Sequence, residues 1–311
     1  MNKTDKIYVA GHNGLLGSAI VRLLQKNGYN NLITKSSKDL DLRNSHDVEL
    51  FFEENNPDVV ILAAAKVGSI KENVEYPVEF LSDNIQIEIN VINSAFKNGV
   101  ENLLFVSSAC IYPENSKQPL KEKYILNGRL EAENEAYGFA KLVGLKLCQF
   151  YNKEYGTNYV TAVPTNLYGV GDKFDPEHSH VITGVMTRMH DAKVNNKPSV
   201  DVWGTGNIYR EFLYIDDAAD GIIFLLNNDH NFDVVNIGTG IDLTIKELVY
   251  QIKEIVGFEG ELYFDTTKPD GIYKRQLDMS KLESLGWRPK ISLKKGIKLT
   301  YDWYLETLSK K

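Results

Sequence analysis

Residues 7–17 of the chain, IYVAGHNGLLG, decide its fold. Four apolar residues that favour a β-strand come first, and apolar residues at helical spacing continue beyond the last glycine. Glycines at positions 11, 14 and 17 allow a tight turn, a close approach of the backbone to a pyrophosphate and close packing of the next helix. The stretch predicts a dinucleotide-binding turn, whose expected contacts are Gly11, Asn13, Gly14, Leu15, Leu16 and Gly17.

Beyond this turn, apolar strands alternate with helical segments through the first half of the chain. We predict strands at residues 32–34, 59–62, 103–106 and 159–163, and helices at residues 47–55, 77–97 and 137–155. Strands that are apolar throughout indicate a parallel sheet covered on both faces. The predicted fold class is therefore α/β, with a Rossmann-type doubly wound parallel sheet.

The second half of the chain is richer in glycine and proline after Pro164. Helical patterns at residues 181–192, 216–226, 245–256 and 293–305 alternate there with shorter elements, which indicates a smaller mixed α/β lobe. We expect residues 1–165 to form a cofactor-binding Rossmann domain, to which later segments return. Residues 166–311 are expected to form a mainly substrate-binding domain.

Composition excludes several classes of protein. The 311 residues carry a formal net charge of -7, which argues against a nucleic-acid partner or an anionic membrane surface. Two cysteines are too few for a disulfide framework, and no apolar run is long enough to span a bilayer. A cytoplasmic protein without a membrane or nucleic-acid partner is the expectation.

The segment after the second predicted strand, residues 34–38 (TKSSK), bears on the choice of cofactor. An acidic residue there would bind the ribose of NAD and repel a 2′-phosphate, whereas hydroxyl and ammonium groups suit that phosphate. Lys35 and Ser36 are therefore expected cofactor contacts, and NADP(H) is the predicted cofactor. The alternative is that these lysines belong to a solvated turn.

Tyr137 and Lys141 lie four residues apart, which places them on one face of a helix. The ammonium beside the phenol is expected to lower the phenol's pKa, so that Tyr137 can exchange a proton with a substrate. Ser108 follows the fourth predicted strand, at the sheet edge where ligands bind. The three residues predict a reductase site in which a nicotinamide delivers hydride, the alternative being simple core packing.

Cys110 and His180 form a second candidate pair. Protons next to a ketone are acidic enough to be abstracted, so an acid and a base on opposite faces of a sugar ring would allow epimerisation. The alternative is that Cys110 is a small buried hydrophobe and His180 a loop residue. No metal is predicted, because the His and Cys residues lack the spacing of metal ligands.

Cations and an aromatic residue in the second half suit a nucleoside diphosphate. Arginine forks match pyrophosphate, and an indole can stack on a base. Solvated surface charge is the alternative for any one of these residues. The candidates are Arg188, Trp203, Arg210, Lys274 and Arg275.

Taken together, these residues resemble the GDP-L-fucose synthases, also called GDP-4-keto-6-deoxymannose epimerase/reductases, within the extended short-chain dehydrogenases. The glycine spacing matches the variant of that group, and the similarity covers nearly the whole chain. Its most specific marks lie at residues 10–14, 63–68, 110–113, 164–169, 179–182, 210–213 and 268–271.

The resemblance implies roles for individual residues. Ser108, Tyr137 and Lys141 would carry out reduction, and Cys110 and His180 would be the base and acid of epimerisation. It also implies NADP(H), a GDP-linked keto sugar and a homodimer formed through the helices near residues 77–97 and 137–155. Further implied cofactor contacts are Ala63, Ala64, Lys141, Pro164, Asn166 and Leu167, and implied substrate contacts are Asn166, His180, Val181, Arg188, Trp203, Arg210 and Arg275.

The chain also departs from the family pattern. Asn13 and Ser37 stand where arginines grip the cofactor phosphate in family members, and Tyr209 and residues 272–274 differ near the sugar. The expected substrate is therefore a GDP-4-keto-6-deoxy hexose or heptose, with C3/C5 epimerisation left open. The alternatives are a nucleotide-sugar 4,6-dehydratase, which would normally show an acidic pair near Ser108, a 4-epimerase, or a non-catalytic dinucleotide-binding protein.

Overall fold

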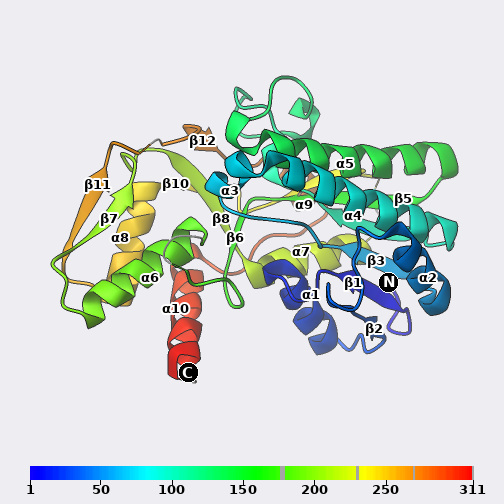
Figure 1. Cartoon of the computed structure of the whole chain (residues 1–311), viewed down its shortest axis with the longest axis horizontal. Helices are drawn as coiled ribbons and strands as arrows, with labels where there is room; N and C mark the ends of the chain where they lie inside the picture. The colour runs from blue at the N-terminus through cyan, green and yellow to red at the C-terminus, as the bar shows by residue number, and fades with distance from the viewer. Residues whose placement is uncertain (176–178, 229–230, 269, 310–311) are drawn as a thin grey trace.

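The computed structural model of the chain describes residues 1–175, 179–228, 231–268 and 270–309. Two lobes lie side by side (Figure 1), the larger containing the N-terminus and the smaller containing the long C-terminal helix. Within the described residues, no helix is both long enough and apolar enough to cross a membrane.

A six-stranded sheet forms the centre of the larger lobe, and every neighbouring pair of its strands is parallel. The first strand lies between the second and the third, so the direction of winding reverses beside it, which is where ligands bind in open α/β sheets. In spatial order the strands are β2 (Leu32–Ile33), β1 (Ile7–Ala10), β3 (Val59–Leu62), β4 (Asn102–Val106), β5 (Asn158–Pro164) and β9 (Val234–Ile237).

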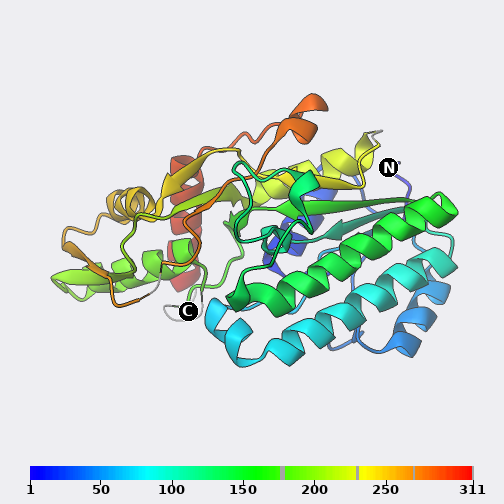
Figure 2. The same cartoon turned by 90° about the horizontal axis from the view of Figure 1, so that it is seen from above.

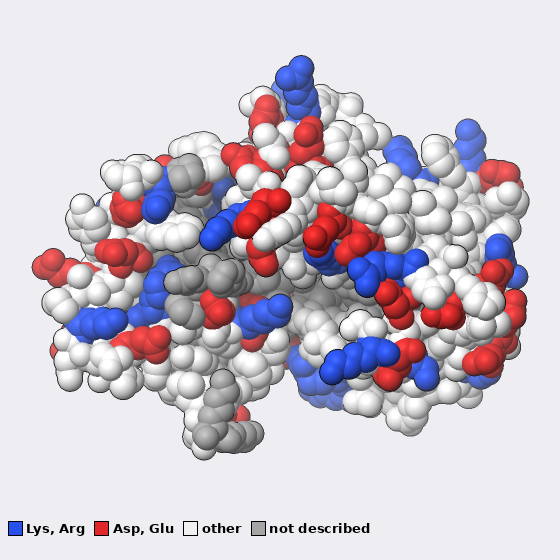
Figure 3. Space-filling view, in the orientation of Figure 1, with Lys and Arg blue, Asp and Glu red and all other residues white. Residues whose placement is uncertain are grey.

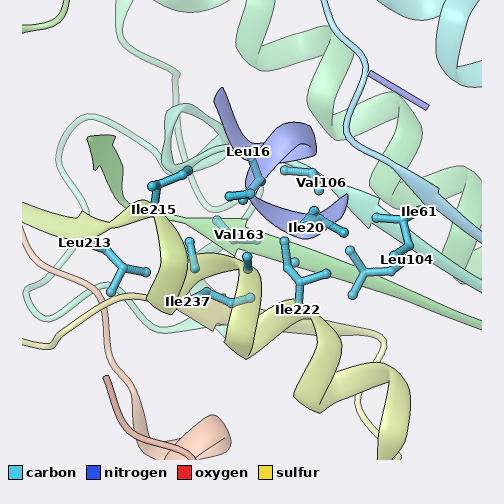
Figure 4. Close-up of a cluster of buried hydrophobic side chains, with 14 of the residues drawn as sticks. Leu16, Ile20, Ile61, Leu104, Val106, Val163, Leu213, Ile215, Ile222 and Ile237 are labelled. Carbon is cyan, nitrogen blue, oxygen red and sulfur yellow. The ribbon is translucent and has the colours of Figure 1, made fainter. Parts of the chain in front are cut away.

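Helices cover both faces of this sheet, as the wholly apolar strands predict. On one face α1 (Leu15–Lys26) packs against α7 (Ile215–Asn227), and Figure 4 shows Leu16, Ile20 and Ile222 meeting the strands there. On the other face α4 (Pro77–Lys97) runs alongside α5 (Glu135–Tyr155), with α2 (Ser45–Asn55) next to α4 (Figure 2). The predicted fold class is confirmed.

The smaller lobe combines short strands with three main helices. Strand β8 pairs with β6, β10 and β12, while β7 and β11 form a separate parallel pair. The elements are β6 (Asn166–Tyr168), α6 (Val181–Val194), β7 (Ser199–Trp203), β8 (Tyr209–Tyr214), β10 (Asp242–Thr244), α8 (Ile245–Val256), β11 (Glu261–Asp265), β12 (Lys274–Arg275) and α10 (Leu293–Ser309). The short helix α9 (Ser280–Ser284) packs against β9 of the larger lobe.

The structure refines the predicted elements. The second strand ends at Ile33, and the helix that carries Tyr137 begins two residues early, at Glu135. A short helix α3 (Ile70–Glu75) was not predicted; Ser69 and Glu72 form a capping box at its start. Both β9 and α7 pack within the larger lobe although they follow residue 165. The division into functional domains stays a prediction.

Candidate active site

The glycine turn at the end of β1 is fixed by close backbone contacts. Gly11 has φ +88°, and a Cβ atom on it would lie 2.6 Å from the backbone nitrogen of Ala64. A Cβ atom on Gly17 would lie 2.1 Å from the carbonyl oxygen of Gly11. No side chain fits at either position, so the start of α1 packs tightly against the ends of β1 and β3, where Ala63 and Ala64 lie.

The same turn contains a polar group suited to a phosphate. Nδ1 of His12 is buried and has no hydrogen-bond partner within the described residues. A buried polar atom of this kind costs free energy unless a ligand or water satisfies it. Together with Gly14 at the N-cap of α1, His12 makes the turn compatible with a dinucleotide pyrophosphate.

The segment after β2 holds a contact that the sequence analysis missed. The Ser36 hydroxyl donates a 2.6 Å hydrogen bond to Oδ2 of Asp39. This hydrogen bond is the main reason that the pKa of Asp39 lies below its usual value. The expected cofactor contacts Lys35 and Ser36 therefore lie close to an exposed carboxylate, and the three-residue spacing of Ser36 and Asp39 was the available signal.

Ser108 and Cys110 lie in one turn at the carboxyl end of β4. Ser108 caps the short 3-10 helix η1 (Ala109–Ile111), and its Oγ accepts a 3.2 Å hydrogen bond from the backbone N–H of Cys110. A Cβ atom on Gly138 would lie 2.9 Å from the Cys110 carbonyl oxygen. The absence of a side chain at Gly138 thus lets the start of α5 pack closely against this turn, which brings Tyr137 near Cys110.

The electrostatic environment of Tyr137 differs from the sequence-based prediction. The pKa of the Tyr137 phenol is raised, first by burial and then by the charges of Cys110 and Glu88. The predicted lowering by Lys141 is wrong for this structure, because the ammonium of Lys141 lies 5.7 Å from the Tyr137 ring centroid and 3.1 Å from Oε1 of Glu88. Burial outweighs the cation, and the phenol stays protonated at neutral pH.

Glu88 is a residue of the site that the sequence analysis missed. It lies on α4 among Phe80, Asn84, Val91 and Ile92, at the i, i+4 spacing of the buried face of that helix. Its place at a core position of the helix pattern could have identified Glu88, because a buried carboxylate is rare unless it has a charged partner.

His180 has a partner in the loop that precedes α6. Its Nδ1 lies 3.4 Å from Oδ1 of Asp172, and the second oxygen of this buried carboxylate accepts a 3.3 Å hydrogen bond from Thr183. The hydrogen bond with Asp172 raises the pKa of His180, whose side chain is 64% exposed. Asp172 therefore orients His180 and favours its protonated form, which suits a general acid. The sequence analysis did not identify Asp172.

Two arginines of the smaller lobe lie side by side in paired strands. Arg210 on β8 pairs in register with Arg275 on β12, and burial followed by the Arg275 charge lowers the pKa of Arg210 to about 10. Arg275 donates a 2.7 Å hydrogen bond to the Ala109 carbonyl and a 3.0 Å hydrogen bond to Glu131. Arg275 thus joins the smaller lobe to the Ser108–Cys110 turn, whereas Lys274 pairs with Asp242.

The surface is hollowed at the junction of the lobes (Figure 3), whereas β7, which ends at Trp203, lies on the outer side of the smaller lobe (Figure 1). Asn166 donates a 2.9 Å hydrogen bond to the Glu211 carbonyl, and burial lowers the pKa of Arg188 on α6. Trp203, at the end of β7, has 67% of its surface exposed, with the Lys268 ammonium 5.7 Å from its ring. Pro164 ends β5, Leu167 lies in β6 and Val181 begins α6.

Known proteins match this chain over nearly its full length. The model of the NAD dependent epimerase/dehydratase family matches residues 7–238. GDP-L-fucose synthase 1 from Arabidopsis thaliana is 52% identical over 307 residues, which are 99% of this chain and 95% of that protein. A GDP-6-OMe-4-keto-L-xylo-heptose reductase from C. jejuni is 40% identical, with a TM-score of 0.93 and 99% of both chains covered.

A solved structure with a cofactor is also similar. This GDP-mannoheptose C4 reductase from Campylobacter jejuni has NADP bound. It is 41% identical to the chain, with a TM-score of 0.90, and the match covers 98% of this chain and 99% of that one.

Proposed function

This chain belongs to the NAD dependent epimerase/dehydratase family and, within it, to the GDP-L-fucose synthases, and from this premise we propose that it reduces the 4-keto group of a GDP-4-keto-6-deoxy sugar with NADPH. It is an NADP-dependent oxidoreductase. The observation that carries the proposal is the packing of Tyr137 against the Ser108–Cys110 turn through Gly138. The sugar is a hexose or a heptose, as in the fucose synthase and heptose reductase relatives.

Each residue of the reductase site has one task in the reaction. When bound, NADPH supplies the hydride that forms the new C–H bond at C4 of the sugar. Tyr137 gives its hydroxyl proton to O4, so that the ketone becomes an alcohol, and Ser108 donates a hydrogen bond to the same oxygen. The raised pKa of Tyr137 keeps that proton in place at neutral pH, which suits reduction.

We also assign binding residues to the two ligands, NADPH and the GDP-sugar. We assign the pyrophosphate of NADPH to the glycine turn and His12, and the 2′-phosphate to the segment after β2. For the GDP moiety, Arg188, Arg210 and Arg275 supply cations and Trp203 a stacking surface. Further cofactor contacts are Asn13, Leu15, Leu16, Lys35, Ser36, Ala63, Ala64, Pro164, Asn166 and Leu167, and further sugar contacts are Asn166, His180 and Val181.

A direct assay tests the proposed reduction. Purified protein is mixed with NADPH and either GDP-4-keto-6-deoxymannose or a GDP-4-keto-6-deoxyheptose, and nicotinamide absorbance is followed. A decay that needs both ligands supports reduction, and analysis of the products identifies the sugar and its stereochemistry. If the trace stays flat with both sugars although NADPH binds, the proposed reduction is wrong.

Epimerisation is a second proposed activity, favoured by the pairing of His180 with Asp172. Cys110, as base, would remove a proton from C3 or C5 beside the ketone, and the electrons would pass into an enolate. His180, as acid, would return a proton to the opposite face of the carbon, which inverts its configuration without net oxidation or reduction. The ketone remains for the reduction that follows.

Replacing Asp172 with Asn tests the role of this pair. Because Asp172 raises the pKa of His180, the folded protein keeps the imidazolium to a higher pH than it would without that carboxylate. In Asp172→Asn, the alkaline limb of C3/C5 proton exchange should therefore move to lower pH, while the pH profile of reduction stays in place. Deuterium incorporation from solvent, measured by mass spectrometry across pH, checks this. An unchanged exchange profile would show that Asp172 does not govern His180.

We also propose a homodimer formed through α4 and α5. These helices run side by side (Figure 2). They expose large apolar side chains, among them Val78, Phe139, Val143 and Phe150. Phe150→Glu should convert the dimer to a monomer, since burying an unpaired charge in an interface is costly. Light scattering after size exclusion measures the mass, with Tyr250→Glu on α8 as the control. A wild-type protein that is monomeric at micromolar concentration would contradict the proposal.

A further inference from the structure

Glu88 and Lys141 form an ion pair inside the larger lobe. Glu88 extends from α4 and Lys141 from α5; their side chains are 1% and 2% exposed, and Nζ lies 3.1 Å from Oε1. Taking both charges out of water is costly, and a pair of apolar side chains at the same place would often be as stable or more so. Stability alone therefore gives no reason for this pair.

Helix α5 is shaped to receive the carboxylate. Gly144 lies three residues after Lys141, on the same face of the helix. A Cβ atom on Gly144 would lie 2.6 Å from Oε2 of Glu88 and 2.5 Å from the Phe105 ring. Any side chain at position 144 would thus push Glu88 away from Lys141. Gly144 therefore leaves room for the Glu88 carboxylate where α4 and α5 pack closely.

The Lys141 ammonium has aromatic rings around it in addition to the carboxylate. The Phe105 ring centroid lies 4.8 Å from Nζ, and the Tyr137 ring centroid lies 5.7 Å away. Both side chains are almost fully buried, so little water surrounds the ammonium. Burial raises the pKa of Glu88, and the Lys141 charge within contact distance opposes that shift and favours the carboxylate. Lys141 thus contacts Glu88 and lies near the Tyr137 ring, so Glu88 can act on the phenol through this ammonium as well as through its own charge.

We propose that Glu88 is a positioning residue for ketone reduction, whose carboxylate holds the Lys141 ammonium, in its charged form, beside Tyr137. This inference rests on the proposed reductase function. The titratable groups that face the pair are Tyr137 and Cys148 on α5 and Cys110 on η1. Burial raises the pKa of the Cys148 thiol, so this neighbour stays neutral through the range in which the enzyme is assayed.

Glu88→Gln removes the charge and keeps the shape. Without the carboxylate, the charged form of Lys141 becomes unfavourable in its dry surroundings, and one of the charges that raise the pKa of Tyr137 disappears. As a result, Lys141 and Tyr137 should each lose the proton that reduction requires at a lower pH than in the wild type. The alkaline limb of the kcat/KM profile for reduction should therefore move down by about one pH unit or more. The factor by which kcat falls should be larger than the factor by which the KM for the sugar changes.

Companion variants separate positioning from a general loss of structure. Glu88→Asp keeps the charge and should return the alkaline limb toward its wild-type position. In a Lys141→Met background, Glu88→Gln should lower kcat by a smaller factor than it does in the wild type, because the part of its effect that Lys141 carries is already lost. Glu122→Gln is the matched control: Glu122 is also a buried carboxylate, but it accepts a hydrogen bond from the Asn236 N–H and lies near Lys281. Its pH profile should match the wild type.

The outcomes decide between the two proposals. An alkaline limb that stays in place in Glu88→Gln, or a full additional loss of kcat in the Lys141→Met background, would overturn the role of Glu88 while wild-type turnover upholds the reductase. Wild-type protein that oxidises no NADPH with either ketosugar would overturn the reductase itself, and with it the positioning role. If Glu88→Gln does not fold, the profile of Glu88→Asp and the activity of the double variant still decide the matter.

Discussion

Tyr137→Phe is expected to lower kcat for ketone reduction by about 10²-fold or more. The change removes only the hydroxyl, so the ring still packs where the start of α5 meets the Ser108–Cys110 turn. The developing oxyanion at O4 then has no proton donor, although the hydride can still be delivered. The measurement is single-turnover decay of NADPH absorbance with saturating sugar, which isolates the chemical step from product release.

Tyr151→Phe is the matched control for this experiment. Tyr151 lies on the same helix, and its hydroxyl donates a hydrogen bond to Asn93, so the change removes an equivalent group elsewhere on α5. Its kcat should stay near the wild-type value, and NADPH should bind both variants with similar Kd. Tyr137→Phe turning over at close to the wild-type rate would show that another group protonates O4.

Cys110→Ser is expected to lower deuterium exchange at C3 and C5 by about 10² to 10⁴-fold, the range that general base catalysis contributes. Serine is close in size and keeps the backbone N–H that donates to Ser108, but its hydroxyl is a far weaker base than a thiolate. Reduction of a ketosugar that needs no epimerisation should continue, because Ser108, Tyr137 and Lys141 are unchanged. Mass spectrometry of sugar incubated in deuterated buffer without NADPH measures the exchange.

Cys148→Ser provides the comparison, because Cys148 is fully buried on α5. Its exchange rate should stay at the wild-type level. If wild-type protein exchanges no deuterium while it reduces the ketosugar, Cys110 and His180 have no role as base and acid. The chain would then be a reductase alone, and the pairing of His180 with Asp172 would serve to bind the substrate.

Local sequence pattern predicts the scaffold of this protein well. The strand at residues 7–10 shows its apolar run locally, and the spacing of Gly11 and Gly17 reflects their contact with each other, so both can be predicted from the sequence. The contact of Gly11 with Ala64, at the end of β3, cannot be predicted in this way. The apolar strands likewise predict the sheet, since burial on both faces leaves a continuous hydrophobic run. The helical spacing of Tyr137 and Lys141 places both on α5, as the structure shows.

Electrostatic partners are harder to predict because they come from distant parts of the chain. Glu88 precedes Lys141 by more than fifty positions, and only the contact between α4 and α5 brings the two together. Arg275 and the Ala109 carbonyl are separated by 166 positions. The direction of the Tyr137 pKa shift depends on burial, which a four-residue spacing does not contain. Periodicity therefore locates the reacting groups, and tertiary contacts set their charges.

The return of the chain from the smaller lobe to the larger one limits how this enzyme can be divided or recombined. A fragment that ends near residue 165 would lack β9 and α7, leaving β5 with an unpaired edge and α1 without its neighbour. Such an edge invites aggregation. Neither half is thus an independent module, and a chimera that borrows another sugar specificity must be spliced at several junctions. For the same reason, we expect changes of sugar specificity in this fold to arise by point substitutions and loop changes.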